Sequence, residues 1–473
     1  MWYVIFVNGL VLQFFAALMA LDALVFHGTS ASFGLAAIVT GTIGGLVSLA
    51  TASSPDDLRR PHIFLLTTSV WTSAALAGAA PLALWSLSLT DAVFEAMSGI
   101  TTTGATVMSG LDEAPRGIIF WRALLQGVGG VGFIVTGMAL LPILRVGGMQ
   151  LFRTESSDKG GKELRNAAGF ATATLQIYAG LIALCAVAYV AGGMNVFDAV
   201  THAMTTLSTG GYSGYDASFG HFQSPFLQWT CTLFMFLGAL PFAWYIRIGY
   251  RGAYRSEQVE AMAWTLALSI IGLAAWLSLA RGIAPFEALR LVAFNVVSVV
   301  TTTGYATTDY TLWGPFATAA FFVLTAVGGC TGSTSGGAKA MRWLLAARAV
   351  VTRVKLVQSP SRVLTIKYEG RRVEEDVLNG VSSFFLFYFA TFAVLSLALS
   401  LLGLDMLTAA SGALTALANV GPGVGSVIGP AGNFESLTDP EKLVLVFGML
   451  LGRLEMLTAL VLLTPMFWRE AIR

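Results

Sequence analysis

The chain has 473 residues, of which 56% are hydrophobic and 11% charged, with a positive mean hydropathy and a net charge of +1. A chain of this composition cannot hide its apolar residues inside a soluble fold. The composition therefore excludes a soluble domain and predicts a polytopic membrane protein.

Apolar stretches long enough to span a bilayer, which requires about 20 residues, begin at the start of the chain. The first stretch lacks the charged leader and small-residue cleavage site of a secretory signal, so we expect it to be retained as a helix. We predict ten spans, at residues 2–26, 32–52, 62–89, 117–144, 169–192, 223–246, 261–280, a broken one at 315–350, 381–402 and 442–466.

Basic residues are concentrated in the loops that follow every second predicted span. These loops and the C-terminal tail hold 21 of the 27 Lys and Arg residues, mainly in 145–165 and 339–372. By the positive-inside rule this face is cytoplasmic. Both termini are therefore expected inside the cell. The three cysteines, which all fall in apolar spans, indicate neither a disulfide nor a metal site.

Four stretches rich in Thr, Ser and Gly recur about every hundred residues, on the predicted outer side. They read TTTGAT, STGGYS, TTTGYAT and ANVGPGVG, and we match glycines 104, 210, 304 and 421 among them. The residues expected to bind an ion are Thr102, Thr103, Gly104, Ser208, Thr209, Gly210, Thr302, Thr303, Gly304, Asn419, Val420 and Gly421.

A short apolar segment of about a dozen residues precedes each stretch and begins near an acid: Asp91, Asp198, Glu287 or Asp405. Such segments are too short to cross a bilayer, so we expect re-entrant half-helices with the acids at their starts. Irregular backbone survives at membrane depth only inside protein or along a watery path. Carbonyl oxygens on such a path can replace the water shell of a cation. Close helix packing through small residues is the alternative; it is our interpretation of GVGGVGF at 127–133.

The third repeat breaks its last span with GGCTGSTSGGAK at 328–339. This is not a phosphate-binding P-loop, which needs Gly-Lys followed by Ser or Thr, whereas Ala340 follows Lys339. We predict a flexible loop below the ion-binding stretches.

Arg453 lies near the middle of the last predicted span, where a charge is costly and marks function by default. Glu455 is two residues further on and does not share a helix face with Arg453. Arg453 is expected to face the pore or another helix. The structural alternative is an interhelical ion pair, with Glu455 or Asp22 as the partner.

These motifs, with GRLEMLT at 452–458, give the chain a resemblance over nearly its whole length to the Trk/Ktr/HKT superfamily of potassium-uptake proteins, closest to the bacterial TrkH branch. The resemblance implies an all-α membrane protein with four pseudo-symmetric M1-P-M2 repeats, similar to potassium-channel subunits, around a central pore. Two extra transmembrane helices precede them. The implied units are the helix pair 1–61; repeat 1 at 62–150 with filter 101–106; repeat 2 at 169–250 with filter 207–213; repeat 3 at 259–350 with filter 300–306 and gating loop 328–338; and repeat 4 at 378–468 with filter 418–425.

The resemblance also implies a role for each region. The transported ion is potassium, and the chain, a transporter and not an enzyme, sits in the bacterial inner membrane as a homodimer. A TrkA-like cytoplasmic protein that binds NAD(H) or ATP/ADP regulates it, so no nucleotide is expected on this chain; membrane lipid is an expected contact and nucleic acid is not. The gate would comprise Gly328, Gly329, Gly332, Ser333, Thr334, Gly336, Gly337, Lys339 and Arg453.

Other functional classes remain as alternatives. A potassium-binding subunit of an ATP-driven pump, similar to KdpA, or a sodium-coupled transporter of the KtrB type would use comparable filters. Channel-like flux, proton symport and sodium symport are all compatible with the four stretches, and Asp22 is a weak candidate for a proton relay. A membrane enzyme is disfavoured because the four histidines are scattered and no nucleophile motif is present.

Overall fold

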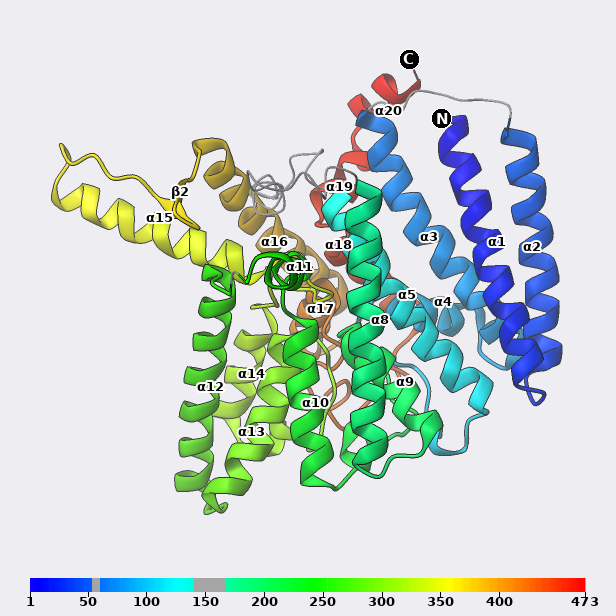
Figure 1. Ribbon diagram of the computed structural model, residues 1–473, viewed down its shortest axis with the longest axis horizontal. Coiled ribbons are helices and arrows are strands. Elements are labelled where there is room, and N and C mark those ends of the chain that lie inside the picture. The colour runs from blue at the N-terminus through cyan, green and yellow to red at the C-terminus, as the bar shows by residue number, and fades with distance from the viewer. Residues whose placement is uncertain (53–59, 140–166, 253, 473) are drawn as a thin grey trace.

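The computed structural model describes residues 1–52, 60–139, 167–252 and 254–472, and nearly all of its regular structure is helical. In Figure 1 most helices run roughly along one direction, and both chain ends lie at the same edge. Among the described residues, six helices are long and apolar enough to cross a membrane, and two sharply bent pairs bring the number to eight. The molecule is thus an all-α polytopic membrane protein, as predicted.

Two N-terminal helices, α1 (Trp2–Val25) and α2 (Ser30–Thr51), form a pair at one side of the molecule (Figure 1). They approach closely because both carry glycine at the contact: a Cβ on Gly9 would lie 2.9 Å from the Ser48 nitrogen. Small residues commonly allow such packing between membrane helices. The pair precedes the first repeat, as expected.

Each of the four repeats contains a first helix, a short re-entrant helix and an inner helix. The re-entrant helices end inside the protein, and their last residues are buried. In chain order the repeats are α3 (Arg60–Trp85), α4 (Leu89–Ile100), α5 (Arg116–Ala139); α8 (Ala167–Ala191), α9 (Val196–Leu207), α10 (Pro225–Gly238); α12 (Glu257–Arg281), α13 (Pro285–Val300), α14 (Pro315–Thr325); and α16 (Glu375–Leu401), α17 (Met406–Ala418), α18 (Asp439–Arg453).

Acids stabilise the starts of the re-entrant helices in two ways. Asp405 is itself the N-cap of α17 and accepts two hydrogen bonds of 3.1 Å from N–H groups of the first turn. Asp91 and Asp198 lie three residues after the caps Ser88 and Asn195 and exchange hydrogen bonds with them. Both arrangements satisfy N–H groups that have no partner within the helix.

The inner helices of repeats 2 and 4 are broken, whereas the sequence predicted continuous spans at 223–246 and 442–466. After α10 the chain turns by 89° at Pro241 into α11 (Phe242–Arg251), and after α18 it turns by 110° into α19 (Leu457–Leu460). Glu455 and Met456 have positive φ angles of 62° and 49° at the second bend. Hydropathy did not reveal the bends because residues on both sides of each one are apolar.

The third inner helix also ends early, and a loop at 326–339 separates α14 from α15 (Ala340–Gln358). In Figure 1, α15 projects sideways from the body, together with the short hairpin of β1 (Lys367–Tyr368) and β2 (Arg371–Arg372). The chain ends in α20 (Pro465–Ile472). The predicted basic loop 145–165 lies outside the described residues, as does Arg59.

Packing divides the interior into two large hydrophobic clusters. One joins the N-terminal helices with repeats 1 and 4, and the other joins repeats 2 and 3. Large apolar side chains cover the outside instead, such as Leu279, Phe286 and Leu401, each 88% exposed. An apolar surface of this kind suits contact with lipid rather than water.

Candidate ion-conducting site

Backbone conformation identifies the equivalent residues of the four filter stretches. In each stretch a non-glycine residue and, two positions later, a glycine have positive φ. The N–H group between them donates to the carbonyl five residues earlier, as from Thr103 to Ser98. The equivalent triplets are Thr102–Thr103–Gly104, Thr209–Gly210–Gly211, Thr302–Thr303–Gly304 and Asn419–Val420–Gly421.

This register corrects the match predicted for repeat 2. The glycine with positive φ is Gly211, at 74°, and not Gly210. Ser208, placed in the filter by the sequence, is equivalent to Thr101 and follows the last residue of α9. Adjacent glycines are indistinguishable by composition, so only the φ angles and hydrogen bonds resolve the register.

The third residue of every triplet is a glycine with positive φ, and each of these four glycines lies against a carbonyl oxygen of the next repeat. The distances from an added Cβ to that oxygen would be 2.1 Å for Gly104 and Gly210, 1.9 Å for Gly211 and Thr303, 1.9 Å for Gly304 and Val420, and 3.0 Å for Gly421 and Thr103. The fourth repeat thus meets the first, and four glycines alternate with four carbonyls in a closed ring. We call these eight residues the ring.

The ring has the chemistry of a site for a dehydrated cation. Four carbonyl oxygens, one from each repeat, are of the kind that can replace water around a cation, and the four re-entrant helices end with their partially negative carboxyl ends beside the ring. Within the described residues, no three His, Cys, Asp or Glu side chains converge to hold a resident metal ion. The candidate ligands are therefore backbone oxygens, more than the threonine hydroxyls.

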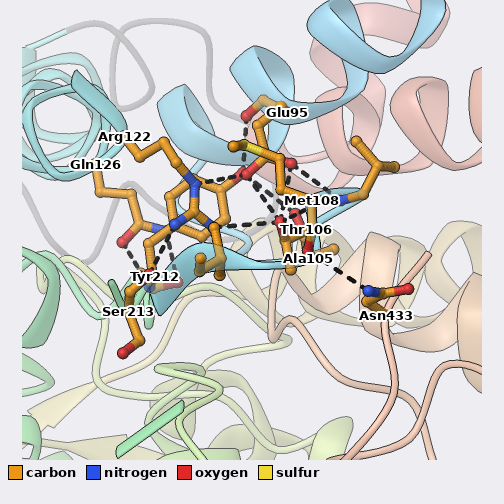
Figure 2. A network of polar contacts seen from close by, with 12 residues as sticks. Glu95, Ala105, Thr106, Met108, Arg122, Gln126, Tyr212, Ser213 and Asn433 are labelled. Atoms are coloured by element: carbon orange, nitrogen blue, oxygen red, sulfur yellow. Dashed lines mark hydrogen bonds and ion pairs between the residues drawn. The ribbon is translucent and has the colours of Figure 1, made fainter. Parts of the chain in front are cut away.

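A buried ion pair lies behind the ring in repeat 1 (Figure 2). Arg122 Nε donates to Glu95 Oε1 at 2.8 Å, and Arg122 Nη1 donates to the Ser213 carbonyl at 2.7 Å. The Glu95 carboxylate also accepts from the Val107 N–H at 3.0 Å. This pair connects the irregular segments that follow the ring residues in repeats 1 and 2 to helices α4 and α5. Neither Arg122 nor Glu95 was predicted from the sequence, although a charged residue inside an apolar stretch was a signal that could have identified them.

The position of Glu95 carries a different residue in each repeat. His202 contacts Ser213 Oγ through Nε2 at 3.0 Å, and Asn295 donates to Thr307 Oγ1 at 3.0 Å. Repeat 4 has Gly412 there, seven residues before the first residue of its triplet as in the others. The side chains that brace the ring from behind thus differ from repeat to repeat, from an ion pair to none.

Two tyrosines directly after ring glycines connect neighbouring repeats. The Tyr212 hydroxyl donates to the carbonyls of Glu95 and Ala105, at 2.8 and 3.2 Å. The Tyr305 hydroxyl lies 2.5 Å from Thr205 Oγ1 on the preceding re-entrant helix. These contacts hold adjacent repeats at a defined separation and so help to set the diameter of the ring.

The loop between α14 and α15 lies directly beneath the ring. Thr334 Oγ1 donates to the Leu207 carbonyl at 3.0 Å, and the Gly336 N–H donates to Thr302 Oγ1 at 2.7 Å. A Cβ on Gly336 would lie 2.3 Å from the Ala418 carbonyl. The loop therefore contacts the ends of three re-entrant helices, which puts it near the centre of the four repeats, and residues 328–336 are all buried.

A cluster of charged side chains lies on the same side of the ring. Arg453 Nη1 donates to the Thr334 carbonyl at 3.0 Å, and Lys339 Nζ donates to the Ser335 carbonyl. Glu455 forms an ion pair with Arg342. Arg453 is therefore bonded to the loop, and the carboxylate two residues on pairs with the helix that follows the loop.

The structure brings together all of the residues predicted for the gate. Gly332 accepts from the Phe242 N–H at 2.9 Å, and Ser333 Oγ donates to the Cys330 carbonyl at 2.7 Å. Gly328 and Gly337 have positive φ and lie against each other, where a Cβ would be within 3 Å of backbone. Asp22, the other partner considered for Arg453, is buried near Thr29 and the start of α5.

Comparison with known proteins places the chain in a family. The family model TrkH, described as a cation transport protein, matches residues 30–270 and 278–470. The Trk system potassium uptake protein TrkI of Halomonas elongata is 48% identical over 474 residues, which cover 99% of this chain and 96% of that protein. TrkH of Escherichia coli is 34% identical and covers 98% of both chains.

A solved structure has the same fold. The crystal structure of the potassium transporter TrkH from Vibrio parahaemolyticus matches with a TM-score of 0.90 at 33% identity, and the match covers 98% of this chain and 99% of that one. These relatives are transport proteins and not enzymes. The chain belongs to the TrkH family of cation transport proteins.

Proposed function

We propose that the chain is the potassium-conducting subunit of a Trk-type uptake system. The observation that carries the proposal is the closed ring of four glycines and four carbonyls, which offers a dehydrated cation one oxygen from each repeat. The names of the relatives, which describe potassium uptake, support potassium as the ion.

The loop at 328–338 and Arg453 form the gate in this proposal. Their support is geometric: the loop is buried below the ring, and Arg453 donates to it. A guanidinium close to the ion path repels a cation electrostatically while the loop blocks it sterically. Opening requires the loop to leave its contacts with the re-entrant helices.

The chain acts in the bacterial inner membrane with both termini in the cytoplasm, and as a homodimer. A TrkA-like regulatory protein, which binds the nucleotide, docks on the basic face around α15 and controls the loop. The support for this docking surface is the exposed charge of Arg353 and Lys355 near the end of α15 and of Arg362 just after it.

Reconstitution of the purified chain alone into liposomes tests the proposal. We expect passive uptake of rubidium and potassium in preference to sodium, and modulation of this uptake by the cytoplasmic partner. Flux that requires an ATP-driven partner would favour a pump subunit, and flux that requires a sodium gradient would favour a sodium-coupled transporter.

Deletion of residues 330–336 tests the gate separately. We expect the deletion to raise cation flux because it removes the segment beneath the ring. Unchanged flux and selectivity in a folded deletion variant would contradict the gating role.

A further inference from the structure

Repeat 2 differs from the others at the middle position of its triplet. The equivalents of Gly210 are Thr103, Thr303 and Val420, all of which carry a side chain. A Cβ on Gly210 would lie 2.3 Å from Cδ, 2.4 Å from Oε1 and 2.7 Å from Nε2 of Gln126. The amide of Gln126 therefore occupies the space that the side chain fills in the other three repeats.

Gln126 also forms hydrogen bonds with the backbone of the filter stretch of repeat 2. Its Nε2 donates to the Gly210 carbonyl at 2.6 Å, and its Oε1 accepts from the Tyr212 N–H at 3.0 Å. A backbone carbonyl only accepts and an N–H only donates, so the orientation of the amide is determined. Gln126 is fully buried and lies beside Tyr212 in Figure 2.

The other inner helices place different residues at this position. Gly129, Gly238 and Gly452 are equivalent, because a Cβ on each would approach the carbonyl of the last or next-to-last residue of the re-entrant helix in its own repeat. Three residues before these glycines stand Gln126, Met235 and Met449. Gln126 of repeat 1 thus stands where repeats 2 and 4 have methionine. Gly210 of repeat 2, against which Gln126 packs, stands where the other repeats have a residue with a side chain.

We propose that Gln126 is a positioning residue that determines the cation selectivity of the ring by holding Gly210 in place from the neighbouring repeat. The inference rests on the proposed function. The Gly210 carbonyl is one of the four in the ring, and it has a second lone pair available for a cation while it accepts from Gln126. Without a side chain of its own, Gly210 depends on the amide to fix where this oxygen lies.

The consequence is a specific effect on selectivity. Discrimination between potassium and sodium depends on the size of the coordinating cage and on the number and strength of its carbonyls. If the filter stretch of one repeat is free to move, the ring can contract around the smaller ion. The flux of sodium then rises relative to that of potassium. A loss of general packing would instead lower the flux of both ions together.

The experiment compares three variants in liposomes by the ratio of rubidium to sodium flux. We expect Gln126→Met to lower this ratio roughly fivefold, the factor that corresponds to the net value of a hydrogen bond. Gly210→Thr alone should lower it as well, because the threonine and the Gln126 amide compete for the same space. The double variant Gln126→Met/Gly210→Thr should recover the wild-type ratio to within about twofold, since it supplies the residue types used elsewhere in the ring.

Gln228→Met is the matched control. Gln228 is a buried glutamine of α10 whose amide donates to the Phe222 carbonyl, away from the ring. We expect this control to keep the wild-type ratio.

An unchanged ratio in Gln126→Met would overturn the proposal. So would a double variant that is folded but no more selective than Gln126→Met. The double variant also distinguishes the proposal from misfolding. It removes the same glutamine but fills its space, so a recovered ratio shows that the single variant lost selectivity and not its fold. Wild-type protein that passes no rubidium would contradict the proposed function instead, so the two failures are distinguishable.

Discussion

In the ring, four repeats contribute the same backbone conformation. The loop below the ring, by contrast, is found only in the third repeat among the described residues, and individual side chains hold it in place. The ring glycines share positive φ angles and the same approach to the next carbonyl. Arg453 and Lys339 donate to carbonyls of the loop, and the Arg342–Glu455 pair anchors the helix that follows it. Ion coordination can be repeated around an axis, but a single movable obstruction needs only one repeat to depart from the pattern.

The largest effect is expected when the ring glycines are replaced by alanine. Gly211→Ala and Gly304→Ala should lower rubidium flux on the order of a hundredfold, because the Cβ would strike a carbonyl at 1.9 Å and the φ angle is unfavourable. Gly421→Ala, with 3.0 Å of room, should be the mildest of the four ring substitutions.

Flux assays on all four variants check this order. The matched control is Gly272→Ala in α12, where a Cβ would meet nothing within 4 Å. Equal effects at all four ring positions would contradict the ring geometry.

The next largest effect is expected below the ring, with the opposite sign. Arg453→Ala should raise cation flux roughly tenfold, since it removes a buried positive charge and its hydrogen bond to Thr334. Arg353→Ala on α15, an exposed position, should leave the flux of the isolated chain unchanged. If Arg453→Ala had wild-type conductance and selectivity, its role in the gate would be abandoned.

A smaller effect is expected from the ion pair that joins the start of α15 to the bend of repeat 4. Glu455→Gln and Arg342→Gln should each increase flux severalfold by loosening the helix that follows the loop. In a double-mutant cycle the two changes should show a coupling of about 1–2 kcal/mol in the free energy of unfolding. Strict additivity would mean that the pair does not act as a unit.

The smallest effect concerns the cap of α17, far from the loop. Asp405→Ala should destabilise the protein by about 1 kcal/mol through loss of the N-cap, measured by thermal unfolding in detergent. Hydrogen bonds from Thr408 hold the pKa of the Asp405 carboxyl below 3.8. Its charged form therefore adds stability above pH 3.8, which is lost as the pH falls through the lower folded pKa.

Asp405→Asn separates charge from capping. Asparagine is also a good cap but does not titrate, so this variant should lack the increment of stability that wild type loses in acid. The same acid dependence in both proteins would assign it to another carboxylate.

Much of the fold could be predicted because it depends on local patterns. Each of the ten apolar stretches predicted as spans contains helix, although only six helices, or eight with the bent pairs, are long enough to cross a membrane among the described residues. The hydroxyl-glycine motifs behind short apolar segments located the four re-entrant helices. The break at GGCTGSTSGGAK was also predictable, since glycine-rich polar sequence does not continue an apolar helix. The bends after α10 and α18 were not, because apolar residues continue through both.

The membrane class, the four repeated stretches and the loop after the third could be predicted from the sequence, because composition and motif spacing encode them along the chain. Three facts come only from the arrangement in space: Gly211 and not Gly210 is the ring glycine with positive φ in repeat 2, Arg122 pairs with Glu95, and Gln126 fills the place beside Gly210. The physical reason is that these facts depend on φ angles and on partners distant in the sequence, such as Gln126 and Gly210, which are 84 residues apart. Neither the φ angles nor these distant contacts produce a pattern that can be recognised in a single sequence.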